Sequence, residues 1–284
     1  MDESTAFLKR LEDIKDVPSI PVVALKINRM LEDDNISVNA ISLIIEKDAA
    51  IVSKILRLVN SPFYGFKGKI DNISRAVIVL GLNTVHNAVL AVSVMDAFSG
   101  RNRDRFHDMQ EYWRHSISTA VFARHLSSRT GIDLPDRAFI AGLLHDIGKL
   151  ILMEFFPDIY EQITGMMHKE EINFMDAERY VYPSNHAEVG RVLAARWHLP
   201  VILQATIGCH HSPGKMDGAE TLAMIVHAAD YLANNPDAQG PDVIRRLDPA
   251  VADNIKETIN DINAWRQEIA EEIETACRFF LQDG

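Results

Sequence analysis

Apolar side chains recur at helical spacing along most of the chain, and this pattern does most to limit what it can fold into. In residues 21–34, apolar positions return every three or four residues, and a proline stands in the first turn. No segment shows the sustained alternation of apolar and polar residues, bounded by hairpin turns, that marks a half-buried strand. The sequence therefore predicts an all-α protein.

The first part of the chain reads as a bundle of five or six short helices. Two of them start at residues whose side chains can cap a helix, Ser37 and Asp48. The charged stretch SGRNRDR, Ser99 to Arg105, is the clearest change of composition along the chain. We therefore predict a boundary there, between an N-terminal helical bundle over residues 1–104 and a second helical unit over residues 105–284.

Helices resume beyond this boundary. One segment, residues 136–156, includes the run GLLHDIGKLIL and stops before a proline. One or two amphipathic helices are predicted between Pro249 and Leu281. The second unit is thus helical as well, and we expect the two bundles to pack together.

The charge balance argues against some classes of partner. The chain has 284 residues, of which 29 are basic and 40 acidic, so its formal net charge is −11. Such an acidic surface disfavours binding to nucleic acid or to an anionic membrane. Residues 38–61 could form a helix–turn–helix, but Glu46 and Asp48 flank its turn, where phosphate contacts would be needed. Two core helices of a bundle explain the segment better, and no nucleic-acid partner is expected.

One uncharged run has the length of a membrane-spanning helix. Residues 76–95 contain no Asp, Glu, Lys or Arg. Gly81, Asn83 and Thr84 interrupt this run, which favours two buried helices with Asn83 or Thr84 as the N-cap of the second. The charged N-terminus does not resemble a signal peptide, and a count of two cysteines suits a reducing compartment. We expect a cytoplasmic protein with no membrane partner.

The run GLLHDIGKLIL places a histidine and an aspartate, His145 and Asp146, among apolar residues. Burying these two polar groups is costly unless they pair with each other or bind a metal ion. Other apolar segments carry further candidate donors, which are His115, His186, His210, His211 and Asp230. Neutral imidazole and carboxylate groups are common ligands of divalent transition metals.

Seven donors from five segments exceed what one tetrahedral ion needs. Adjacent residues of a helix point about 100° apart, so His145 and Asp146 can serve two neighbouring ions, with the carboxylate bridging them. The pattern predicts a site for two divalent ions of Fe, Mn, Zn or Ni. The alternatives are a neutral His145 that is hydrogen-bonded to Asp146, and a pair of histidines, His210 and His211, that merely ends a helix.

This ordered series of histidines and aspartates resembles that of the HD superfamily of metal-dependent phosphohydrolases. Further stretches narrow the likeness to the HDOD family, the HD-related output domain of bacterial signalling proteins. They are PSIPVVALKINRMLED, DAAIVSKILRLVNSPFYG, ISRAVIVLGLNTVHNAVL, WRHSISTA, AGLLHDIGKLIL, HAEVGRVLAARWHLP and VHAADYLA. The likeness runs from about Pro18 to about Ala233. It implies an all-helical fold, a second unit of HD-domain type, and a cytoplasmic role in signal output.

The resemblance leads to two hypotheses for the function. Every ligand position of a two-metal HD site is filled, which favours a metal-dependent phosphodiesterase or phosphohydrolase acting on a nucleotide, with Asp146 and Lys149 as catalytic residues. The HDOD-like first half favours a regulatory module. So does the sequence SPGKMDGAE, which stands where the cyclic-di-GMP-hydrolysing HD-GYP branch has Glu and Gly-Tyr-Pro. We favour the module, which retains the metal site and acts through a signalling protein partner or a small nucleotide ligand.

Other residues near these motifs have simpler interpretations. Lys149 could equally be a helix-surface lysine paired with a neighbouring acid, and Glu111 reads as a solvated carboxylate. Cys209 reads as a buried thiol. Three histidines match no ligand position and are interpreted as lying around the site or on the surface, namely His125, His198 and His227. An aromatic loop is interpreted as packing between the two halves of the chain, through Phe63, Tyr64 and Phe66.

Overall fold

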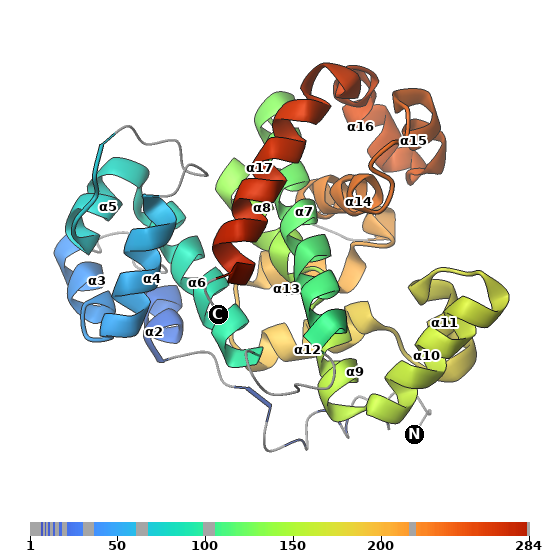
Figure 1. The fold of residues 1–284 in the computed structure, drawn as a ribbon, viewed down its shortest axis with the longest axis horizontal. Coiled ribbons are helices and arrows are strands. Elements are labelled where there is room, and N and C mark those ends of the chain that lie inside the picture. The colour runs from blue at the N-terminus through green and yellow to red at the C-terminus, as the bar shows by residue number, and fades with distance from the viewer. Residues whose placement is uncertain are drawn as a thin grey trace.

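The computed structural model describes residues 22–30, 37–60, 68–98, 106–215 and 220–282, together with six isolated positions, Phe7, Lys9, Leu11, Ile14, Val17 and Pro18. Every regular element within these residues is a helix (Figure 1), which confirms the prediction of an all-α protein. No helix in this part of the chain combines the length and the apolar character needed to cross a membrane.

The N-terminal bundle contains the helices α2 (Val22–Met30), α3 (Val38–Ile45), α4 (Ala49–Val59), α5 (Ile73–Leu80) and α6 (Leu82–Phe98). Both predicted caps are confirmed. The Ser37 side chain accepts a hydrogen bond from the backbone N–H of Ala40, and Asp48 accepts from those of Ala50 and Ile51. Helix α3 packs on α5, and α4 packs on α6. The segment 38–61 thus contributes two core helices to a bundle, as expected.

The uncharged run 76–95 forms two helices, as predicted, but the break between them has a different cause. Gly81 has a positive φ of 89°, a conformation that glycine adopts without steric cost, and α6 starts at the next residue. Asn83 and Thr84 therefore lie inside the first turn of α6, and the prediction that one of them is its N-cap is wrong. The Thr84 hydroxyl instead donates to the carbonyl of Leu80.

The second part of the chain is built around one long helix, α7 (Phe106–Thr130), which packs on α8 (Pro135–Leu144) and on three later helices. Figure 1 shows the last helix, α17 in red, lying along α7 in green. Two amphipathic helices, α16 and α17, fill the predicted C-terminal stretch, whereas α10 and α15 were not predicted. The remaining elements are α9 (Ile147–Phe155), α10 (Pro157–Glu170), α11 (Phe174–Val181), α12 (His186–Arg196), α13 (Val201–Cys209), the short 3₁₀ helix η3 (Pro213–Lys215), α14 (Glu220–Asn234), α15 (Gly240–Arg246), α16 (Pro249–Asn260) and α17 (Ile262–Gln282).

One apolar core joins the two parts of the chain. The ring centres of Phe98, at the end of α6, and Trp197 lie 6.2 Å apart. The Trp197 indole N–H donates to the Pro18 carbonyl at 2.8 Å. Phe7 packs against rings of the second part, those of Phe156 and Tyr182. The predicted boundary at residues 99–105, and the aromatic loop with Phe63, Tyr64 and Phe66, lie outside the described residues.

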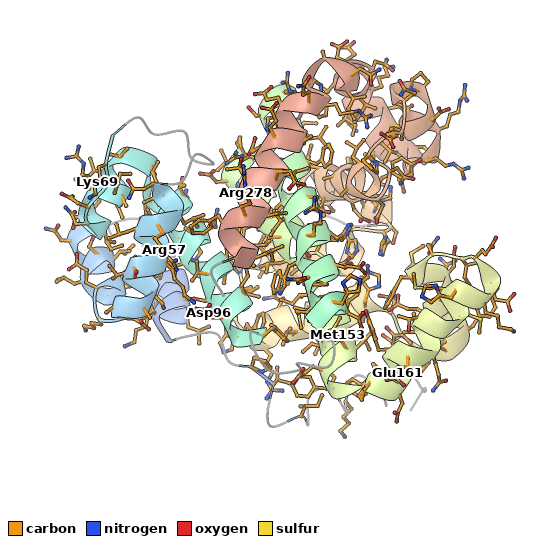
Figure 2. The ribbon with its side chains drawn as sticks, in the orientation of Figure 1. Arg57, Lys69, Asp96, Met153, Glu161 and Arg278 are labelled. Carbon is orange, nitrogen blue, oxygen red and sulfur yellow. The ribbon has the colours of Figure 1, made fainter. Side chains whose placement is uncertain are left out.

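Ion pairs add connections at the surface. Asp96, labelled in Figure 2, pairs with Lys54 and so ties α6 to α4. Helix α17 pairs with α7 along its length, through Arg114 with Glu274, Arg124 with Glu272 and Arg129 with Glu268. The Arg114–Glu274 and Arg129–Glu268 pairs are exposed, and such pairs contribute about 0–1 kcal/mol each. The Arg124–Glu272 pair is half-buried. The apolar core therefore carries most of the stability.

His86, in α6, leads to a prediction about acid stability. Burial lowers the pKa of its imidazole from 6.5 to about 4. Between these two values the unfolded chain binds a proton that the folded chain does not, so the free energy of unfolding falls as the pH falls. From pH 7 to pH 5, a His86→Gln variant should lose about 2 kcal/mol less stability than the wild type, as measured by urea unfolding. The exposed His168→Gln control should follow the wild type, and equal losses in all three proteins would contradict the prediction.

Candidate metal centre

The segment 136–156, predicted as one helical stretch, is broken in its middle. Helix α8 ends at Leu144, His145 is its C-cap, and Asp146 stands before α9. The prediction of an unbroken helix is wrong for a physical reason. Adjacent side chains of a continuous helix point about 100° apart, whereas the break turns both side chains to the same place, with Nε2 of His145 3.3 Å from Oδ2 of Asp146.

Two glycines allow other helices to approach this break. A Cβ atom on Gly148 would lie 1.9 Å from the His186 carbonyl oxygen, at the start of α12. A Cβ atom on Gly142 would lie 2.8 Å from the Ala120 Cα atom in α7. Only glycine permits backbones to come this close. The sequence G-x-x-H-D-x-G therefore brings α7 and α12, with their own histidines, against the His–Asp pair.

A first group of donors surrounds Oδ2 of Asp146. His115, from α7, places Nε2 3.5 Å from this oxygen and 3.4 Å from Nε2 of His145. Asp230, from α14, places Oδ1 3.1 Å from Nε2 of His115 and 3.6 Å from Nε2 of His145. These four residues come from α7, the α8–α9 break and α14.

A second group surrounds the other oxygen of the same carboxylate. Nε2 of His186 lies 3.0 Å from Oδ1 of Asp146, and Nε2 of His210 lies 3.7 Å from it. His211 completes the group, with Nε2 2.8 Å from that of His186. The structure thus brings all seven predicted donors together, in two groups that share Asp146.

Hydrogen bonds on the outer nitrogen fix the orientation of three of these rings. Nδ1 of His145 lies 2.7 Å from the Gly142 carbonyl, and Nδ1 of His210 lies 2.8 Å from the Ile207 carbonyl. Nδ1 of His186 lies 2.7 Å from a carboxylate oxygen of Glu178. These oxygens only accept, so Nδ1 carries the proton in each ring, and in the neutral imidazole the Nε2 lone pair faces the centre.

The centre requires positive charge. Burial alone lowers the pKa of His145, but the carboxylates of Asp146 and Asp230 outweigh it and raise that pKa to about 10. Burial, followed by the neighbouring imidazoles, holds the pKa of His210 well below its ordinary value. Although burial opposes it, the nearby cations lower the pKa of Asp146. Without a metal ion, protons on some of the imidazoles balance the carboxylates.

The donor set fits a metal ion. Oδ1 of Asp146 is buried and accepts no hydrogen bond from any described residue. An unpaired buried carboxylate oxygen is costly, and the atoms nearest to it are Nε2 atoms that face it with lone pairs once the imidazoles are neutral. A cation between these atoms gives the carboxylate oxygen a partner and separates it from the imidazole lone pairs that would otherwise repel it. Imidazole and carboxylate donors suit Fe, Mn, Zn or Ni, so this His/Asp cluster can bind a metal.

The centre is open along one edge. The side chains of His115 and Lys149 are 20% and 22% exposed, whereas those of His145 and Asp146 are buried. The Lys149 ammonium donates to Oδ2 of Asp146 at 2.5 Å and lies 4.9 Å from the centre of the Phe174 ring. Lys149 thus points into the centre at its partly exposed edge, and it is also paired with an acid.

The structure places the other candidates outside the cluster. Glu111 pairs with the exposed His107, and His125 pairs with Glu272 of α17. His198 is exposed and Cys209 is half-buried. His227 lies behind the centre, where its Nδ1 donates to the His210 carbonyl at 2.8 Å and helps to hold that turn.

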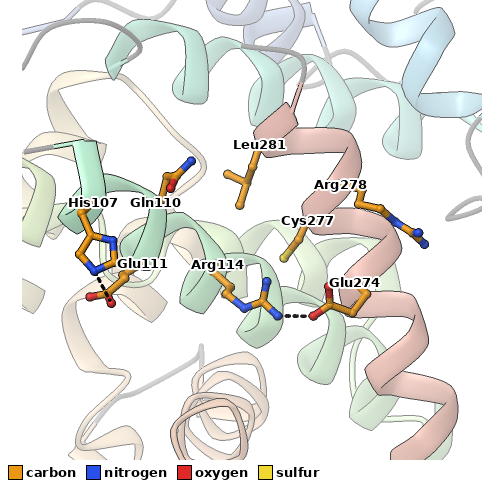
Figure 3. Close-up of a pocket in the computed structure, with 8 residues that line it drawn as sticks. All are labelled: His107, Gln110, Glu111, Arg114, Glu274, Cys277, Arg278 and Leu281. Carbon is orange, nitrogen blue, oxygen red and sulfur yellow. Dashed lines mark hydrogen bonds and ion pairs between the residues drawn. The ribbon is translucent and has the colours of Figure 1, made fainter. Parts of the chain in front are cut away.

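A separate cavity lies between α7 and α17 and contains none of the predicted donors (Figure 3). Its volume is about 420 Å³, and the ion pair of Arg114 with Glu274 crosses it. Burial raises the pKa of the Cys277 thiol in its wall to about 11, so this sulfur is protonated at neutral pH and is a poor nucleophile. The chemistry-bearing groups are therefore those of the His/Asp cluster.

Sequence reasoning missed Glu178 and Tyr182. Both side chains are buried, and the Tyr182 hydroxyl donates to Oε1 of Glu178 at 2.7 Å. In the sequence, DAERYV reads as an ordinary amphipathic helix with exposed charges. The signal that was available is the four-residue spacing of Phe174, Glu178 and Tyr182, which places the first two on one face of α11 and the third at its C-cap.

A helical bundle that gathers histidines and aspartates around a His–Asp pair defines a protein of the HD type. The chain belongs to the HDOD family, whose domain model matches residues 17–213. An uncharacterized protein of Treponema pallidum is 30% identical over 200 residues, which cover 70% of this chain and 38% of that protein. A ribonuclease Y of Enterococcus faecalis is 26% identical over 231 residues, 80% of this chain and 35% of that enzyme. The chain thus spans little more than a third of the length of these curated relatives.

Solved structures show the same fold. An HDOD domain protein of unknown function from Geobacter sulfurreducens superimposes with a TM-score of 0.84 at 24% identity and covers 98% of each chain. A Shewanella amazonensis protein, provisionally described as a phosphohydrolase, has a TM-score of 0.76 at 22% identity over 99% of each chain. A Marinobacter aquaeolei protein, provisionally described as acting in signal transduction, has a TM-score of 0.68 at 19% identity over 97% of this chain and 62% of its own.

The close approach at Gly148 gives a stability prediction. A Gly148→Ala substitution pushes a methyl group into the His186 backbone, so α9 and α12 must separate. Overpacking against rigid backbone should lower the free energy of unfolding by about 3 kcal/mol. The control is Gly165→Ala, in an exposed part of α10 with open space around it, which should raise stability by about 0.5–1 kcal/mol. Urea unfolding measures both, and a neutral Gly148→Ala would contradict the close packing.

Proposed function

We propose that this chain is a regulatory signal-transduction protein that keeps a working two-ion metal centre and acts through a protein partner or a small nucleotide ligand. The observation that carries the proposal is the position of Asp146, whose two oxygens each face a separate group of imidazoles. A bridging carboxylate of this kind is typical of two-metal sites. The predicted seven-residue ligand set is therefore retained as a proposal: His115, His145, Asp146, His186, His210, His211 and Asp230.

The charges of the centre support an anionic ligand. Three carboxylates, those of Asp146, Glu178 and Asp230, stand against the single ammonium of Lys149. With neutral imidazoles the balance is negative, and two divalent cations make it positive. Only then does the open edge attract a phosphate group. The two cysteines are free thiols, as suits the cytoplasmic location that we propose.

Metal analysis tests the proposal directly. Protein that is reconstituted with Zn²⁺ and desalted should contain two equivalents by inductively coupled plasma mass spectrometry. His115→Ala should retain only the ion of the second group, and His211→Ala only that of the first, about one equivalent each. Asp146→Asn should lose both, because the amide cannot supply two anionic oxygens.

The exposed His168→Gln variant is the control and should hold two equivalents. Circular dichroism on each variant separates loss of metal from loss of fold. Wild-type protein that is folded but binds no zinc would refute the metal centre. One equivalent that only the first-group or only the second-group variant removes would refute the two-ion arrangement.

A second candidate function is a phosphodiesterase or phosphohydrolase acting on a nucleotide, and the position of Lys149 favours it. Its ammonium lies at the open edge, within reach of both Asp146 and an incoming anion. Divalent ions held by the cluster would supply Lewis-acid activation of a water and of the phosphoryl group. The chain's own residues would hold and orient that phosphate, with Lys149 neutralising charge on its oxygens.

Turnover by metal-loaded protein decides between the two candidates. A screen of cyclic and linear nucleotides should show a phosphate-releasing or ring-opening activity if the chain is an enzyme. In that case Lys149→Met should lower kcat/KM by about 10²–10³, the loss typical for removal of one charge-stabilising donor, while metal content stays at two equivalents. Binding of a nucleotide without turnover supports the regulatory module.

A further inference from the structure

The carboxylate of Glu178 is buried outside the ligand set, and within the described part of the chain it accepts three hydrogen bonds from two residues. Oε1 accepts from the Tyr182 hydroxyl and from the backbone N–H of His186, each at 2.7 Å. Oε2 lies 2.7 Å from Nδ1 of His186. A fully buried glutamate is rare unless it is paired, so these contacts account for its presence in the core.

The bond to Nδ1 determines which nitrogen of His186 faces Asp146. Because a carboxylate only accepts, it keeps the proton on Nδ1 and leaves Nε2 free for a cation. The second bond, to the backbone N–H, holds the first residue of α12 to the same carboxylate. Glu178 thus fixes both the tautomer of the ring and the position of the helix end that carries it.

The rest of the α11 face supports this arrangement. The Phe174 ring, one turn before Glu178, meets the His186 ring edge-on at 5.6 Å between ring centres. The centres of the His210 and His211 rings lie 5.4 and 4.8 Å from that of His186, and their Nε2 atoms lie 3.4 and 2.8 Å from its Nε2. The His186 ring is thus held at Nδ1 by Glu178 and is packed against three further rings.

We infer that Glu178 is a positioning residue for the second ion of the centre, acting through His186 and not by contact with the metal. The inference rests on the proposed two-ion function. Outer carboxylates that hold a ligating imidazole typically change metal affinity by about 10–100-fold when they are removed. Among the described donors, Glu178 hydrogen-bonds to His186 of the second group and to none of the first, so the effect should be confined to the second ion.

The test is a Glu178→Gln substitution, which changes few atoms and removes one acceptor. If the amide N–H₂ faces Nδ1, the imidazole proton must move to Nε2, where it blocks the ligand position. If the amide is turned round, its N–H₂ meets the backbone N–H of His186. Either arrangement should weaken the second Zn²⁺ about 10–100-fold in chelator-competition titrations, while the affinity for the first changes less than about twofold.

The matched control is Glu188→Gln, the same chemical change in α12 at a half-buried residue that pairs with Arg191 and does not contact the imidazoles. It should bind both ions as the wild type does. Tyr182→Phe removes one of the three donors but leaves the carboxylate, so it should keep the tautomer and lose less affinity than Glu178→Gln.

Nuclear magnetic resonance adds a readout that a purely structural role would not change. Long-range ¹H–¹⁵N spectra of the zinc-loaded wild type should show His186 protonated at Nδ1, and the same spectra of Glu178→Gln should lose that signal. Since the wild-type spectrum needs no variant, the inference stays testable if Glu178→Gln does not fold. A wild-type His186 protonated at Nε2, or a folded Glu178→Gln with unchanged affinity for both ions, would overturn it. Wild-type protein that binds no zinc would instead overturn the proposed function.

Discussion

The buried carboxylate of Asp146 is the group on which the rest of the centre depends. A carboxylate without compensating charge is strongly disfavoured in a protein interior. The chain supplies that charge from four directions, through imidazoles of α7, of α12 and of His145 at the end of α8, and through the ammonium of α9. The helices around α9 are therefore held by electrostatics as well as by apolar packing.

Close backbone packing makes this concentration of donors possible. His115 and His186 lie far apart in the sequence, and each reaches Asp146 because a glycine next to the His–Asp pair removes a side chain from the contact. The break between α8 and α9 then turns the two polar residues in one direction. The motif thus has a mechanical part, the glycines and the break, and a chemical part, the donors. Without the glycines and the break, the donors would not meet at Asp146, and without the donors the close packing would enclose no metal site.

The sequence supports predictions whose cause is local. Helical periodicity and the side-chain caps at Ser37 and Asp48 are local properties, and the structure confirms them. The clustering of the ordered histidines and aspartates could be predicted only through the resemblance to a known family. Their spacing in the sequence does not say which of them lie close together in the fold.

Most of the features that could not be predicted from the sequence depend on contacts between distant segments. The break between α8 and α9 places the Asp146 side chain where its two oxygens face imidazoles of α7 and α12, which are distant in the sequence. Glu178 reads as a surface charge until α11 is packed against α12, because burial of a carboxylate is decided by its tertiary partners. At Gly81 a backbone conformation, and not a polar side chain, ended one helix and started the next.

Two of the helices that deliver the first group of donors, α7 and α8, also connect that group to the rest of the molecule. Helix α8, which ends at His145, contacts α6 of the N-terminal bundle, and the Asn87 amide donates to the Asp136 carbonyl at the start of α8. Helix α7, which carries His115, is covered by α17, and the aromatic end of α17 packs on Leu58, Ala88 and Val92 of the N-terminal bundle.

A regulatory protein needs contacts of this kind, because a ligand shifts a conformational equilibrium only through contacts that differ between two states. A change in the metal centre that moves α7 or α8 therefore has a direct mechanical connection to the N-terminal bundle. The connection is thus the feature of the fold that a signalling role would use.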